Sequence, residues 1–196
     1  MIPASEGLQR LRDGNYRFAN GEATNLQSIN QARRAELVDG QNPFAVIVAC
    51  SDSRVPVELL FDQGLGDLFV IRVAGNIVAP SQIGSVEFAA AQLGTRLVVV
   101  LGHSNCSAVD AAQQELAKQQ ETRSPNLRSI VNRIRPALEA LDNPSLDDAV
   151  AANVRNSVAQ LRNSPEILNA LIDSGQLTVV GAQYSIESGV VVFFDD

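Results

Sequence analysis

Four short apolar runs recur along the chain, and Val, Ile, Leu and Ala supply most of their residues. They span Phe44–Ala49, Leu68–Ala74, Leu97–Gly102 and Leu177–Ala182. Because polar residues hardly interrupt them, we expect strands that are buried on both faces, which is typical of a parallel sheet covered by helices. The closing run VVVFF predicts a further strand at the edge of the sheet.

Segments with apolar residues at helical spacing flank these runs. Leu8, Leu11 and Phe18 predict a first helix that stops near Gly21, and a second helix is predicted over Ser28–Val38. The other predicted helices span Gln82–Leu93, Ser107–Gln119, Asn126–Leu141 and Leu146–Leu161. The sequence therefore predicts one α/β domain over residues 1–196, with a mostly parallel central sheet of four strands plus an edge strand, flanked by helices. Residues 1–40 are predicted to form an N-terminal helical arm or outer layer.

Composition excludes several classes of function. The 196 residues carry a formal net charge of -7, which leaves no basic face for nucleic acid. No apolar run approaches the roughly 20 residues that a membrane helix needs, so no membrane partner is expected. The N-terminal segment has no basic stretch followed by an apolar one, which predicts a cytoplasmic protein, or a periplasmic one if a signal peptide has been removed.

The soft metal-ligating side chains are confined to the ends of two apolar runs. Cys50 follows the first run, and His103 and Cys106 follow the third. Since the carboxyl ends of neighbouring parallel strands meet at one edge of a sheet, we expect these side chains to lie together, with Asp52 nearby. Two thiolates and an imidazole favour Zn²⁺ over Mg²⁺ or Ca²⁺. The sequence therefore predicts a zinc site.

Simpler interpretations exist for each residue alone. A lone cysteine is usually a small buried hydrophobe, a lone histidine is usually a hydrogen-bonded core residue, and two cysteines can form a disulfide. The coincidence of all three at successive strand ends favours a metal site instead. Gly64-x-Gly66 does not indicate a dinucleotide site, because it precedes a strand and lacks the third glycine.

The segments CSDSR, FVIRVAGN and GHSNC resemble the β-class carbonic anhydrases. The resemblance implies zinc held by Cys50, His103 and Cys106, and a catalytic pair formed by Asp52 and Arg54. It implies reversible hydration of carbon dioxide to bicarbonate. It also implies a homodimer or a dimer of dimers, with substrate pockets at the interface.

The same resemblance implies a set of residues around the substrate. Gln41 matches a glutamine that binds bicarbonate in some members, and Phe69, Ala74 and Phe88 match positions that line the pocket. Ser107 stands where members of the family usually have glycine after the second cysteine, and its side chain is expected to affect the width of the pocket and the catalytic rate.

The CSDSR segment admits an open and a closed form of the zinc site. If Arg54 holds the Asp52 carboxylate in a charge-assisted pair, the fourth zinc position stays free for water, as a catalytic zinc site requires. If Asp52 becomes the fourth ligand, the site is closed. A closed site would indicate a non-catalytic homologue that binds zinc or bicarbonate. An open site would also suit a related zinc hydrolase acting on carbonyl sulfide or carbon disulfide.

Overall fold

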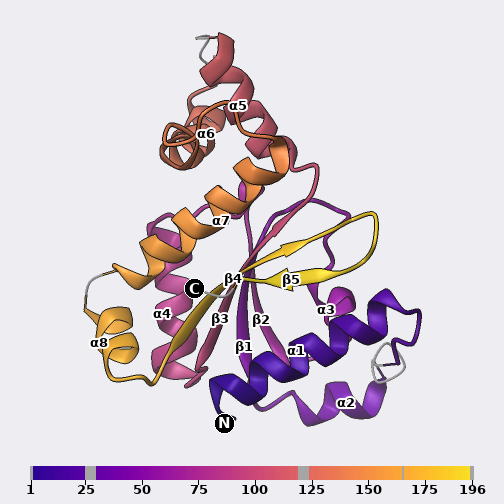
Figure 1. Cartoon of the computed structure of the whole chain (residues 1–196). Coiled ribbons are helices and arrows are strands. Elements are labelled where there is room, and N and C mark those ends of the chain that lie inside the picture. The colour runs from indigo at the N-terminus through magenta and orange to yellow at the C-terminus, as the bar shows by residue number, and fades with distance from the viewer. Residues whose placement is uncertain (1, 25–29, 119–123, 165, 195–196) are drawn as a thin grey trace.

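A five-stranded sheet forms the centre of the structure (Figure 1). The computed structural model describes residues 2–24, 30–118, 124–164 and 166–194. The sheet has the order β2-β1-β3-β4-β5, with the first four strands parallel and β5 antiparallel to β4. The strands are β1 (Ala45–Ala49), β2 (Leu68–Arg72), β3 (Leu97–His103), β4 (Thr178–Tyr184) and β5 (Val191–Phe193). The predicted parallel sheet with an added edge strand is thus confirmed.

Helices occupy the intervals between the strands. They are α1 (Ala4–Ala19), α2 (Gln31–Glu36), α3 (Val57–Leu60), α4 (Pro80–Gln92), α5 (Ser107–Lys118), α6 (Pro125–Leu138), α7 (Leu146–Arg162), α8 (Ile167–Asp173) and the 3-10 helix η2 (Ala74–Asn76). The helices α3, α8 and η2 were not predicted. Positions 28 and 29 of the predicted second helix, and position 119 of the predicted fourth, lie outside the described residues. No helix among the described residues is both long and apolar enough to cross a membrane.

The two faces of the sheet are covered by different helices, which explains why its inner strands are apolar throughout. Along β1, Ala45 and Ile47 pack with α1 and α3, whereas Val46 and Val48 pack with α4, α7 and α8. Figure 1 shows α1 to α3 on one side of the sheet and α4, α7 and α8 on the other. Since side chains alternate between the faces of a strand, both sets must be apolar. Leu11 of α1 is fully buried in the first cluster, so α1 lies against the sheet.

The contact between α1 and the segment after α3 gives a first prediction. A Cβ added at Gly14 would lie 1.8 Å from the backbone oxygen of Phe61, which cannot be relieved by a rotamer change. We expect Gly14→Ala to lower the free energy of unfolding by about 1–3 kcal/mol, measured by urea denaturation. A Cβ at Gly40 meets nothing within 4 Å, so Gly40→Ala is a control expected to stay within about 0.5 kcal/mol of wild type. Equal stability of the two variants would contradict the close docking of α1.

Candidate metal centre

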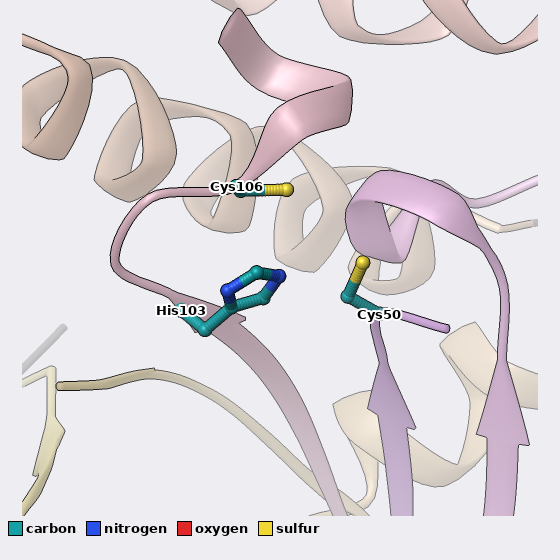
Figure 2. Close-up of side chains that lie close together, drawn as sticks. All are labelled: Cys50, His103 and Cys106. Carbon is teal, nitrogen blue, oxygen red and sulfur yellow. The ribbon is translucent and has the colours of Figure 1, made fainter. Parts of the chain in front are cut away.

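The carboxyl ends of β1 and β3 bring three soft ligands together. Cys50 follows β1 directly, His103 ends β3, and Cys106 precedes the first residue of α5. The strands are adjacent and parallel, with Ala49 paired to Leu101, so their ends lie side by side. The ligand atoms of the three side chains lie within 4.8 Å of one another, and Figure 2 shows the side chains pointing toward one another. The three residues singled out in the sequence therefore form one buried cluster.

The two ring nitrogens of His103 differ in their hydrogen bonding. Its Nδ1 lies 2.9 Å from the carbonyl oxygen of Ser104, so Nδ1–H donates and Nε2 carries the lone pair. Nε2 is buried and has no hydrogen-bond partner among the described residues. A buried polar atom left without a partner costs stability. Coordination of a metal by Nε2, with the other ring nitrogen bonded to a carbonyl, accounts for this arrangement.

The two thiols are electrostatically coupled to each other. A hydrogen bond from the Cys106 thiol, aided by the backbone N–H of Gly75, lowers the pKa of Cys50 to about 4, although burial opposes this shift. The same Cys50–Cys106 interaction, together with burial, raises the pKa of Cys106. The proton shared by the two sulfurs therefore favours Cys106 over Cys50. A metal that binds both sulfurs must displace that proton, so metal binding is coupled to proton release.

The donor set fits zinc. Both cysteines are free of a disulfide, which leaves two sulfur donors and one imidazole nitrogen for a metal. Zinc is bound in proteins by such mixtures of cysteine and histidine, whereas Mg²⁺ and Ca²⁺ take oxygen ligands. Three protein ligands also leave a fourth tetrahedral position, which is the arrangement of catalytic zinc sites.

Asp52 and Arg54 form a bidentate ion pair beside the cluster. Arg54 Nε donates to Asp52 Oδ1 at 2.9 Å, and Arg54 Nη2 donates to Oδ2 at 2.7 Å. Asp52 Oδ2 lies 3.9 Å from His103 Nε2, so the carboxylate borders the proposed metal position. Hydrogen bonds from Arg54 hold the pKa of Asp52 well below its usual range. The carboxylate is therefore ionised and turned toward the arginine.

Sequence reasoning missed two contacts that hold the ligand loops together. Arg72, at the end of β2, donates from Nε to the carbonyl oxygen of Cys50 at 3.0 Å and from Nη2 to that of Asp52. Arg54 also donates to the carbonyl oxygen of Asn105 at 3.2 Å, which joins the loop after β1 to the loop after β3. The sequence did contain a signal for Arg72. It is the one charged residue in the otherwise apolar run Leu68–Ala74, and it lies near the carboxyl end of that run, where the ligands are expected.

Comparison with known proteins identifies the family. A family model described as carbonic anhydrase matches residues 45–191. The chain also superposes on the solved β-carbonic anhydrase CcaA with a TM-score of 0.76 and 29% sequence identity, over 97% of this chain and 88% of that one. This chain belongs to the β-carbonic anhydrase family.

Curated relatives of this β-carbonic anhydrase match nearly its whole length. The carbonic anhydrase of Mycolicibacterium smegmatis is 39% identical over 184 residues, which cover 92% of this chain and 88% of the relative. Carbonic anhydrase 2 of Mycobacterium tuberculosis is 39% identical over 191 residues, covering 94% and 90%. A β-carbonic anhydrase from Coccomyxa, solved in complex with acetazolamide, has a TM-score of 0.71 and 27% identity over 82% of this chain and 75% of that one.

The residues predicted to line the substrate pocket fall into two groups in this β-carbonic anhydrase. Ala74 is the residue before Gly75, whose amide reaches Cys50, and Ser107 is exposed at the start of α5, next to Cys106. Both lie beside the cluster. Whether they contact substrate stays a prediction.

The second group lies away from the cluster within one chain. Phe69 pairs with Val46, which is four residues before Cys50 and so roughly 13 Å away along the strand. Phe88 of α4 packs on Phe69, with 6.3 Å between ring centroids. Gln41 is exposed and precedes β1, so the strand separates it from the ligand end of the sheet. These residues are not brought to the cluster of their own chain, and their role in binding substrate stays a prediction.

Proposed function

We propose that this β-carbonic anhydrase catalyses the zinc-dependent, reversible hydration of carbon dioxide to bicarbonate and a proton. The observation that carries the proposal is Nε2 of His103, which has no hydrogen-bond partner in the described part of the chain and lies within 4.8 Å of two cysteine sulfurs. A carboxylate restrained by an arginine stands beside it. A soft three-ligand site next to an ionised but restrained fourth group suits an open zinc site.

Each residue of the centre has a distinct part in this proposal. Cys50, His103 and Cys106 would hold the metal, which would supply the Lewis acidity that makes water a nucleophile near neutral pH. Asp52 accepts a hydrogen bond from the attacking water and orients it toward the carbon of carbon dioxide. Arg54 keeps Asp52 in that position and off the metal. Because His103 is the only histidine of the chain, the released proton must leave through carboxylates, water or buffer.

We also propose a homodimer in which each chain completes the pocket of its partner. Phe88 is 50% exposed although it is a large aromatic side chain, and it forms a pair with Phe69. Exposed aromatic side chains such as Phe88 are common in protein interfaces. In such a dimer, Gln41, Phe69 and Phe88 of one copy reach the metal centre of the other.

Val192 on the edge strand β5 is 60% exposed, and this edge is the surface we propose for pairing two dimers.

The dimer proposal gives a second prediction. We expect Phe88→Asp to shift the protein to monomers in analytical ultracentrifugation and to lower carbon dioxide hydration by at least about tenfold, since a charge would be buried at the interface. Leu127 is a comparably exposed apolar residue on α6, at 56%, and Leu127→Asp is the matched control. A monomeric Phe88→Asp protein with unchanged turnover would contradict the shared pocket.

The activity itself is tested by stopped-flow hydration of carbon dioxide with the zinc-loaded protein, run beside assays on carbonyl sulfide and carbon disulfide. We expect turnover of carbon dioxide well above that of either sulfur compound. Preferred hydrolysis of a sulfur compound would assign the related hydrolase instead. Retained zinc with no turnover of any of the three would indicate a non-catalytic homologue.

We further propose a cytoplasmic location. Both proposed thiolate ligands must stay reduced to bind zinc, and a reducing compartment maintains free cysteines. Recovery of the protein in the periplasmic fraction of its host would overturn this location and leave the catalytic proposal unchanged.

A further inference from the structure

The loop η2 contacts the first thiolate of the metal centre. The backbone N–H of Gly75 donates to Sγ of Cys50 at 3.3 Å, within the buried interior. Gly75 has φ of 69° and ψ of 20°, and a Cβ there would lie 2.8 Å from Cδ1 of Ile134. The left-handed backbone and the tight packing both require glycine. The hydrogen bond to sulfur therefore depends on how this short loop is held.

Two side chains of α7 hold the loop by its carbonyl groups. Asn153 Nδ2 donates to the carbonyl oxygen of Gly75 at 2.8 Å, and Ser157 Oγ donates to that of Asn76 at 3.1 Å. The two side chains are four residues apart, so they lie on the same face of the helix, one turn from each other. Each is 1% exposed. Consecutive carbonyls of η2 are thus fixed to a helix that is itself anchored in the core through Val154.

Burial of the Asn153 amide lowers the stability of the fold, because one of its polar atoms has no partner in the described part of the chain. Its Oδ1 is buried without a hydrogen-bond partner among the described residues, so half of the amide is left unsatisfied. An unsatisfied buried acceptor costs about 1–3 kcal/mol, which offsets what the hydrogen bond to the Gly75 carbonyl contributes to stability. The amide is therefore better explained by its bond to Gly75 than by a contribution to stability.

We propose that Asn153, assisted by Ser157, is a positioning residue of the metal centre that aims the Gly75 N–H at the Cys50 thiolate. The inference rests on the proposed function. The hydrogen bond draws electron density from the sulfur, which then donates less to the metal and leaves it a stronger Lewis acid. Without Asn153, η2 relaxes, the N–H turns away, and the sulfur donates more strongly. The centre then needs a higher pH to become active.

The test uses protein in which Co²⁺ replaces zinc, because sulfur-to-cobalt charge transfer reports directly on the thiolates. We expect Asn153→Ala to move the charge-transfer band to longer wavelength, since a sulfur without its hydrogen bond gives up electron density more easily. In the zinc protein we expect a higher pH for half-maximal activity and about tenfold lower activity at neutral pH. Ser157→Ala, which changes little volume, should give smaller shifts in the same directions.

Asn156→Ala is the matched control. Asn156 is on the same helix and also donates to a backbone carbonyl, but that carbonyl belongs to Arg133 and not to η2. If the Asn153→Ala and Ser157→Ala proteins keep the cobalt band and pH midpoint of this control, the inference is overturned. If Asn153→Ala does not fold, the result for Ser157→Ala decides. Absence of any sulfur-to-cobalt band in the wild-type protein would instead overturn the metal centre, and this inference with it.

Discussion

The Arg54→Ala variant is expected to retain its zinc and to lose about 100-fold in carbon dioxide hydration. The two side-chain hydrogen bonds from Arg54 restrain the Asp52 carboxylate at 2.9 and 2.7 Å. Asp52 Oδ2 already lies 3.9 Å from His103 Nε2. Once released, the carboxylate can rotate onto the metal and fill the position that the reaction needs. The measurement is a crystal structure of the zinc-loaded variant, which should show the Asp52 carboxylate in the fourth position in place of water, together with stopped-flow activity.

Two further variants isolate the cause of that loss. Adding Asp52→Ala to Arg54→Ala removes the carboxylate that would close the site, so part of the activity should return. The rate should stay below that of the wild type, because no carboxylate then orients the water. Arg10→Ala is the matched control, since Arg10 is similarly exposed and also pairs with a carboxylate, that of Glu6. An Arg54→Ala protein with near wild-type turnover would show that the arginine does not hold the site open.

Replacing Cys106 with Ser is expected to remove nearly all activity, by more than about 100-fold, through loss of the metal. A serine hydroxyl at this position stays protonated near neutral pH, so it supplies neither the charge nor the soft donor that zinc prefers. Cys50→Ser should have the same effect. Zinc content by atomic absorption, after dialysis at a fixed free zinc concentration, gives the loss of affinity directly.

Wild-type protein taken through chelation and return of zinc is the control for the cysteine variants. It should lose its activity with the metal and regain it on reloading, whereas Cys106→Ser should not recover. A Cys106→Ser protein that binds one zinc and keeps its turnover would place the metal elsewhere in the chain.

The sheet and the clustering of Cys50, His103 and Cys106 could be predicted from sequence because each depends on short, local signals. A strand such as β3, buried on both faces, is without polar side chains from Leu97 to Gly102, and this pattern is visible without knowing its neighbours. The ligands Cys50 and His103 could be placed together because parallel strands end at the same edge of a sheet. The short helices α3 and η2 could not be predicted, since four or three residues carry no periodic pattern.

The contacts that hold the loops around the site could not be predicted, because they join residues far apart in the sequence. Asn153 is a buried polar residue on a buried helix face, and its role becomes visible only through its hydrogen bond to Gly75, which is far away in the sequence. The bridge from Arg54 to Asn105 likewise joins two loops whose approach depends on the whole sheet. Phe69 is separated from the cluster by about 13 Å along the strand and Phe88 packs on Phe69, so their predicted role depends on the shared pocket that we propose.

The central claim is that one zinc ion, held by Cys50, His103 and Cys106, makes this protein a carbonic anhydrase. The most direct test is to add zinc stepwise to metal-free protein and to measure carbon dioxide hydration at each step. The rate should rise in proportion to zinc and level off at one equivalent per chain. A rate that stays at the uncatalysed background after one equivalent is bound, or that keeps rising well beyond it, would contradict the claim.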